Sequence, residues 1–94
     1  MGKPPYTSAA RQDLVNMLRY ISRDKPAAAL EWVEKIESKC LLITENPAIG
    51  ELQPKFGDGV RSSTVGRYVI FHRQIAERVE ILRVIAGDQD ITQL

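Results

Sequence analysis

The chain has 94 residues, of which 44% are hydrophobic and 27% are charged, and its net charge is +1. This length fits one domain over residues 1–94, and the composition excludes a wholly disordered chain. The balance of 13 basic against 12 acidic residues excludes the basic excess that drives non-specific nucleic-acid binding. Cys40 is the single cysteine, so no internal disulfide can form. Because the sequence has neither an apolar signal segment nor a membrane-length apolar run, we expect a cytoplasmic protein that does not enter membranes.

Two amphipathic helices are predicted in the first half of the chain. Consecutive prolines favour an extended start over residues 3–7, and Thr7 or Ser8 can cap a first helix that runs to about Ser22. Asp24 is the expected cap of a second helix, which has a proline in its first turn and ends near residue 45, ahead of another proline. Apolar residues recur every three or four positions in both segments, so the helices are expected to form an antiparallel hairpin.

The second half of the chain predicts a β-sheet. Residues 46–59 carry the prolines and glycines that are typical of a loop. Segments rich in β-branched and aromatic residues then predict strands over 60–65, 67–74 and 79–86, with a turn near Ala76–Glu77. Short links between consecutive strands give a three-stranded antiparallel meander. The predicted fold class is α+β, with the helical hairpin packed on one face of the sheet.

Few side chains suit catalysis or metal binding. His72 is the single histidine and lies inside a predicted strand, so a structural or surface role is expected, since no partner set could complete a hydrolytic or metal centre. Cys40 falls on the apolar face of the second helix and is expected to be buried. Trp32 on the same helix is interpreted as core or groove lining, with a partner contact as the alternative. We therefore predict no catalytic residue, no metal and no cofactor.

Arginines are unusually frequent in the predicted sheet, at positions 61, 67, 73, 78 and 83. Arg83 lies inside an apolar strand, where an isolated charge would be very costly. One interpretation is a salt bridge to Glu80 or Asp88, or exposure on the open face of the sheet. The other is a basic patch that holds an acidic segment of a partner protein.

Several segments, taken in order, resemble the ParE branch of the ParE/RelE toxin superfamily. Residues 10–14 (ARQDL) and 18–21 (LRYI) are similar to the family's first helix. Similarity continues in the loop after its second helix at 46–50 (NPAIG), in its middle strand pair at 60–61 (VR) and 68–73 (YVIFHR), and in its last strand at 79–87 (VEILRVIAG). Each segment is short, but together they extend over nearly the full chain.

The resemblance implies a short N-terminal strand, a helical hairpin and a three-stranded antiparallel sheet. It also implies a non-enzymatic toxin of a type II toxin–antitoxin system that inhibits DNA gyrase and so blocks replication. The implied partner is a ParD-like antitoxin whose C-terminal segment wraps the toxin, with operator DNA contacted only through the antitoxin. With this partner in view, our candidate contacts are the polar Arg61, Arg67 and Arg83 and the apolar Leu18, Ile21 and Trp32.

Two alternatives stay open on the sequence. The related RelE branch cleaves messenger RNA on the ribosome with clustered basic residues and a C-terminal tyrosine, which stabilise charge and move protons. Here Tyr68 and Gln89 stand where arginines are expected, and Lys55 is the only lysine of the preceding loop, which disfavours cleavage. The second alternative is a weakly toxic relative that acts only in operon autorepression, because residues 87–90 (GDQD) replace a stretch that is usually basic in ParE toxins.

Overall fold

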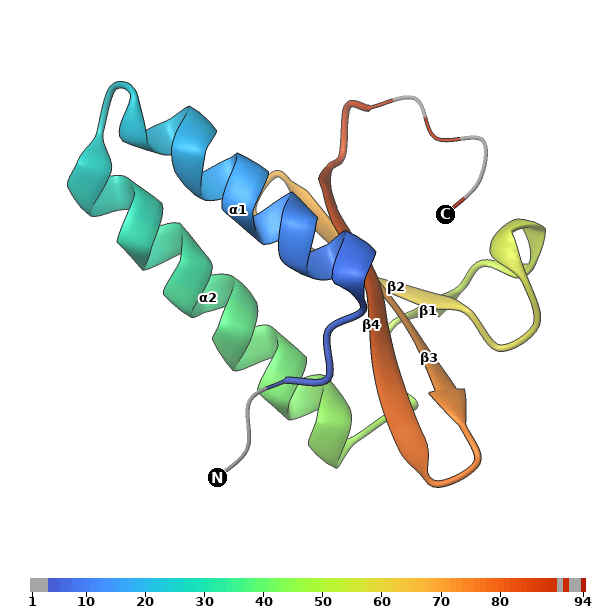
Figure 1. Cartoon of the computed structure of the whole chain (residues 1–94). Coiled ribbons are helices and arrows are strands. Elements are labelled where there is room, and N and C mark those ends of the chain that lie inside the picture. The colour runs from blue at the N-terminus through green and yellow to red at the C-terminus, as the bar shows by residue number, and fades with distance from the viewer. Residues whose placement is uncertain (1–3, 90, 92–93) are drawn as a thin grey trace.

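The computed structural model describes residues 4–89, 91 and 94 (Figure 1). Helices α1 (Ser8–Ser22) and α2 (Pro26–Glu45) form a hairpin that covers one face of an antiparallel sheet. The sheet has the order β1-β2-β3-β4, and a short 3-10 helix, η1 (Pro54–Phe56), follows β1. The strands are β1 (Glu51–Leu52), β2 (Arg61–Val65), β3 (Tyr68–Ile75) and β4 (Arg78–Ala86). The predicted α+β class, with a helical hairpin on an antiparallel meander, is confirmed.

The ends of the helices follow from capping and proline chemistry, with one correction. The backbone N–H of Ala10 donates to Oγ1 of Thr7 at 3.1 Å, so Thr7 caps α1 as predicted. The prediction that Asp24 caps α2 is wrong, because Lys25 occupies the cap position and provides no side-chain hydrogen bond. Pro26 lies in the first turn of α2, where backbone N–H groups have no partner within the helix, so its missing N–H costs no hydrogen bond.

The predicted loop over residues 46–59 contains a strand that the sequence did not indicate. Glu51 pairs with Ser62 and Leu52 with Arg61, so β1 forms the edge of a sheet of four strands rather than three. This strand has only two residues, and both are exposed. It therefore carries no alternation of buried and exposed residues, and its pairing depends on β2 being present.

The expected N-terminal strand is reduced to a single parallel bridge between Tyr6 and Ile81. The N–H of Ile81 donates to the carbonyl of Pro5 at 2.9 Å, and the N–H of Thr7 donates to the carbonyl of Ile81 at 3.0 Å. The hydroxyl of Thr7 also donates to the carbonyl of Leu82 at 2.9 Å. The chain entering α1 thus covers the middle of the outer edge of β4.

A bulge in β4 sets which side chains face the helices. Phe71 pairs with Arg83 while the next residue, His72, pairs with Ile81, so Leu82 is an extra residue on β4. Because of this extra residue, both Ile81 and Val84 point into the core beneath the helices. That core is formed by buried residues of both helices and the sheet, namely Ala10, Met17, Ile36, Cys40, Ile43, Tyr68, Ile70, Val79, Ile81 and Val84.

A smaller apolar cluster lies on the opposite face of the sheet. Val60, Phe71 and Ile85 are buried there. Phe56 of η1 packs edge-on against Phe71, with ring centroids 5.2 Å apart, and Ile91 and Leu94 also contact the cluster. Asp90, the last residue of the stretch 87–90 that departs from the family, lies outside the described residues. None of the helices in the described part of the chain is long and apolar enough to span a membrane.

Candidate partner-binding surface

Arg83 is held by a carboxylate of the first helix. Nε of Arg83 donates to Oδ2 of Asp13 at 2.7 Å, and Nη2 donates to Oδ1 at 2.8 Å. The same carboxylate accepts the backbone N–H of Val84 at 2.9 Å. The side chain of Asp13 is only 10% exposed and that of Arg83 29%. This two-pronged hydrogen bonding favours the charged guanidinium and raises the pKa of Arg83.

The predicted partners of Arg83 are therefore wrong. Glu80 lies 3.6 Å from Nη2 of Arg73, and Asp88 lies 3.5 Å from Nη2 of Arg67. Sequence reasoning missed Asp13, although a signal existed. At helical spacing, Asp13 shares the side of α1 that carries the buried Ala10 and Met17, so its carboxylate needed a partner inside the fold.

The other two candidate arginines are placed differently. Arg61 in β2 donates from Nη1 to the carbonyl of Gly50 at 3.1 Å and is half-buried. Arg67 lies in the turn between β2 and β3, and its side chain is 57% exposed. Arg67 and Arg83 line the same groove, whereas Arg61 does not. Of the two arginines that line this groove, Arg67 is the more accessible to a partner, because its side chain is more exposed than that of Arg83.

The apolar candidates belong largely to the helix–sheet core. Ile21 and Trp32 pack against the core beneath the helices, and Leu18 is half-buried. The ring of Trp32 meets that of Tyr68 edge-on at 5.5 Å and lies directly over Gly66. None of the three lines the groove beside Arg83 or the groove at the end of α2. A partner contact for each of them stays a prediction.

His72 is completely buried, and its imidazole makes a hydrogen bond within the fold. Its Nε2 lies 3.0 Å from the carbonyl of Pro47, which accepts a hydrogen bond, so this nitrogen carries the proton. Nδ1 is buried and has no partner among the described residues. Burial is the largest cause that lowers the pKa of His72 below its ordinary value of 6.5; the hydrogen bond to Pro47 partly opposes it, and the nearby charge of Arg61 lowers the pKa further, so the ring is neutral near pH 7.

Cys40 is buried under the helices, beside Tyr6 of the entering chain. Burial raises the pKa of the Cys40 thiol to about 12, and burial likewise raises the pKa of Tyr6. A thiol in this environment stays protonated and is a poor nucleophile. Within residues 4–89, 91 and 94 there is also no group of three or more histidine, cysteine or carboxylate side chains that could hold a metal ion.

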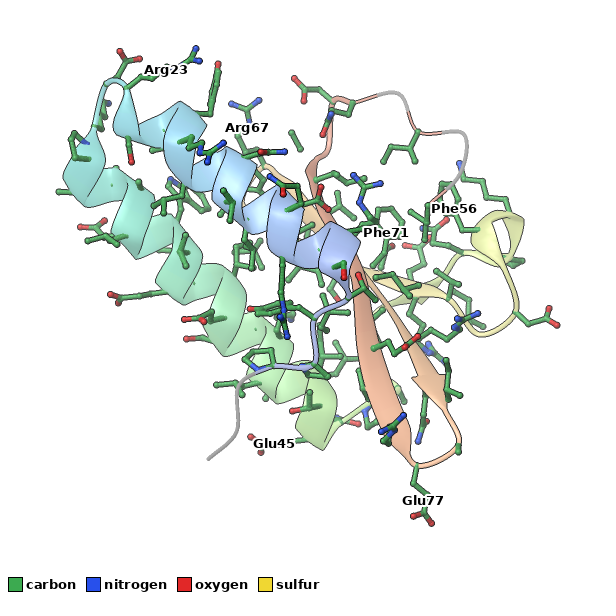
Figure 2. All side chains as sticks on the ribbon, viewed as in Figure 1. Arg23, Glu45, Phe56, Arg67, Phe71 and Glu77 are labelled. Carbon is green, nitrogen blue, oxygen red and sulfur yellow. The ribbon has the colours of Figure 1, made fainter. Side chains whose placement is uncertain are left out.

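Two grooves flank the entering chain along the outer edge of β4. The α1-side groove, of about 450 Å³, is lined by Asp13, Asn16, Met17, Tyr20, Arg67, Tyr68, Arg83, Val84, Ile85, Ala86, Asp88 and Gln89. The α2-end groove, of about 670 Å³, is lined by Pro5, Tyr6, Thr7, Leu41, Thr44, Glu45, Ile75, Glu77, Arg78, Val79 and Glu80. Figure 2 shows Glu45 at the end of α2 and Glu77 at the tip of the β3–β4 hairpin, at the same end of the molecule. The sequence did not indicate the α2-end groove, because its walls come from segments that only the fold brings together.

Comparison with known proteins agrees with the fold and identifies the family. Residues 5–91 match the sequence profile of the family described as ParE toxin of type II toxin-antitoxin system, parDE. A solved structure described as the chromosomal ParDE TA system from P. aeruginosa has a similar fold, with a TM-score of 0.77 and 22% sequence identity. The likeness covers 89% of this chain and 94% of the other. No curated protein sequence matches. Because the family profile spans nearly the whole sequence, this chain belongs to the ParE toxin family of type II toxin–antitoxin systems.

Proposed function

We propose that this toxin acts by binding DNA gyrase in the cytoplasm, where it blocks replication without a chemical step of its own. The observation that carries the proposal is that the side chains best suited to catalysis are used to build the fold. His72 is neutral and bonded to the backbone of Pro47, and Cys40 is buried and protonated. Gyrase as the target rests on the family resemblance set out above. The surface that the chain offers a partner includes the two grooves along β4.

Cleavage of messenger RNA, as in the RelE branch, is the weaker candidate. Such a reaction needs free cationic groups to stabilise the charge that develops on phosphate, and a group that transfers a proton. Arg83 is already bonded to Asp13, and Arg67 lies beside Asp88. Tyr68, which stands where that branch has an arginine, is only 7% exposed and packs in the core. These placements favour binding over catalysis.

A supercoiling assay tests the proposal directly. Purified toxin is incubated with gyrase, ATP and relaxed plasmid, and both supercoiled product and linear cleaved DNA are scored on gels. We expect supercoiling to fall or cleaved DNA to accumulate as the toxin is titrated, whereas toxin unfolded by heat has no effect. Unchanged supercoiling at a large excess of toxin would refute gyrase as the target. Toeprinting on translating ribosomes then examines the alternative, since cleavage in the ribosomal A site would establish nuclease action.

Membership in a two-component family leads to the second part of the proposal, a ParD-like antitoxin that neutralises the toxin. An antitoxin segment that is disordered when free would order as it enters a groove on the toxin surface. Its other half would bind operator DNA, so that the toxin meets DNA only indirectly. Co-expression with the protein encoded next to the toxin gene should restore growth and yield a stable complex on size-exclusion chromatography. Toxicity that this neighbour leaves unchanged would contradict the partnership.

A further inference from the structure

We infer that the α2-end groove binds an extended segment of the antitoxin that carries basic and apolar side chains, and that this segment pairs with the start of β4. This inference rests on the proposed antitoxin partnership. It specifies which groove is used, which backbone groups are contacted and which side-chain chemistry is recognised. Three independent features of the groove support it: its shape, its unpaired strand edge and its charge.

The groove has the size and lining of a peptide site. It lies between the end of α2, the entering chain and the β3–β4 hairpin, and its volume of about 670 Å³ falls within the range of protein ligand pockets. Leu41, Val79 and Ile75 provide apolar surface, and 44% of Ile75 is exposed. A segment that buries an apolar side chain here would gain hydrophobic contact with this lining.

The edge of β4 inside the groove is available for pairing. The N–H and the carbonyl of Ile81 point away from β3, since they bond to the entering chain at Pro5 and Thr7. Val79 is two residues earlier on the same side of the bulge, so its N–H and carbonyl point the same way. Among residues 4–89, 91 and 94, no turn, loop or segment of the entering chain donates to or accepts from these two groups. An extended segment laid in the groove could therefore form both bonds, as in strand addition.

Pro5 keeps the entering chain from forming a hydrogen bond with the carbonyl of Val79. Thr7 donates its N–H to Ile81, so the parallel alignment would place Pro5 opposite the carbonyl of Val79. Pro5 has no N–H and cannot donate there. The pairing between the entering chain and β4 therefore stops at Ile81, and the carbonyl of Val79 is left to another donor.

The charge of the groove selects the chemistry of the segment. Three carboxylates, those of Glu45, Glu77 and Glu80, line the groove against one guanidinium, that of Arg78. Glu80 is partly neutralised by Arg73, whereas Glu45 and Glu77 form no ion pair with any residue that the structure describes. Glu45 comes from the end of α2 and Glu77 from the tip of the β3–β4 hairpin (Figure 2), and both line the groove. A segment with lysine or arginine flanking an apolar residue would complement this arrangement, while an acidic segment would be repelled.

Charge reversal tests the inference. The double variant Glu45→Lys/Glu77→Lys is compared with Glu34→Lys/Glu51→Lys, which makes the same change in net charge at exposed residues outside the groove. The probe is the ParD-like antitoxin encoded beside the toxin gene, labelled with a fluorophore and followed by anisotropy. We expect the groove variant to bind at least about tenfold more weakly than the control variant, and the difference to shrink in high salt. Circular dichroism establishes that both variants fold.

Backbone NMR shows where the segment lies. On addition of the antitoxin to ¹⁵N-labelled wild-type toxin, the largest shift changes should include the amides of Arg78, Val79 and Glu80. Equal binding by the two charge variants, or shift changes confined to the α1-side groove, would overturn the inference while leaving the antitoxin partnership intact. Failure of the wild-type toxin to bind the antitoxin at all would overturn the partnership, and the inference with it.

Discussion

At the scale of single residues, the ion pair between Asp13 and Arg83 links the first helix to the last strand. The carboxylate accepts three N–H groups, two from the guanidinium and one from the backbone of Val84. Because the carboxylate is nearly buried, removing its cation leaves a desolvated negative charge on the side of α1 that faces the sheet. This contact occupies Arg83, so a partner carboxylate would first have to displace Asp13.

We expect Arg83→Met to lower the free energy of unfolding by about 2–4 kcal/mol, somewhat less than for a fully buried pair, because the side chain of Arg83 is 29% exposed. Arg73→Met is the matched control, because the pair between Arg73 and Glu80 is 3.6 Å long and about 40% exposed at each side chain. That substitution should cost less than about 1 kcal/mol. Urea denaturation measures both values. Equal losses would show that the contact with Asp13 contributes no more than a surface ion pair.

His72 should make the toxin sensitive to mild acid. Its pKa is lowered in the folded protein, so the unfolded chain takes up a proton near pH 6.5 while the folded chain does not. The unfolded state then binds more protons, and stability falls as the pH drops below about 6.5. In His72→Gln, which can still donate to Pro47, the fall in urea midpoint between about pH 7 and pH 5 should be smaller. An identical pH dependence would exclude His72 as the source.

At the scale of elements, α2 is fixed on the sheet where Trp32 crosses the β2–β3 turn. Gly66 in that turn has a φ of 58°, in the left-handed region, and a Cβ there would overlap the Trp32 ring. The ring also meets Tyr68 edge-on, and Nζ of Lys35 lies 4.8 Å from its centroid. The turn and the helix therefore depend on each other for their positions.

Gly66→Ala should destabilise the toxin by more than Gly59→Ala. Both glycines have positive φ, so each substitution carries a backbone cost of about 1 kcal/mol, but a Cβ at Gly59 meets nothing within 4 Å. The additional cost at Gly66 comes from moving the Trp32 ring, and we expect a total of about 2–4 kcal/mol. Thermal unfolding gives the comparison, and the fluorescence of Trp32 should shift only in Gly66→Ala. Equal destabilisation would mean that the ring moves aside freely.

The elements themselves could largely be predicted from sequence, because their signals are local. Thr7, two prolines and the apolar spacing define the helices, and β-branched runs define β2, β3 and β4. By contrast, β1 has two exposed residues and forms only through its neighbour. The bulge at Leu82 depends on how β3 and β4 align. Neither feature has a local sequence signal.

The candidate site was less predictable than the elements, because it is formed by residues that lie far apart in the sequence and have no local signal. The frequency of arginine in the sheet is visible in the sequence, but the carboxylate that holds Arg83 lies 70 residues away on α1. Glu45 and Glu77 each look like ordinary surface residues at the end of an element. Only the packing of α2 beside the β3–β4 hairpin places them across one groove. A binding site formed by residues that are far apart in the sequence leaves no motif or hydrophobic periodicity from which it could be predicted.

At the scale of the whole molecule, the charges nearly cancel, with 13 basic and 12 acidic residues. Several of the basic side chains are also paired with carboxylates, such as Arg83 with Asp13 and Arg73 with Glu80. A surface of this kind releases few counterions on contact with a polyanion. This agrees with a toxin that recognises proteins through shape and local charge.

We therefore expect weak binding of the isolated toxin to nucleic acid. In a gel-shift assay with duplex DNA at about 0.15 M salt, low-micromolar toxin should give no retarded band, because the counterion-release contribution is small. Adding the antitoxin with operator DNA should produce a band. A strong shift by the toxin alone, falling steeply with salt, would reveal a basic surface that acts on nucleic acid directly.

The contacts that hold α1 against β4 join residues far apart in the sequence, and this affects folding during synthesis. Asp13 meets Arg83, and Thr7 meets Leu82, across 70 and 75 residues. On the ribosome, the helical hairpin is synthesised before these partners, so α1 cannot be held against β4 until Leu82 and Arg83 have been added and have left the exit tunnel. A nascent chain that stalls before Arg83 lacks the contact with Asp13, so its first helix stays without this link to the sheet.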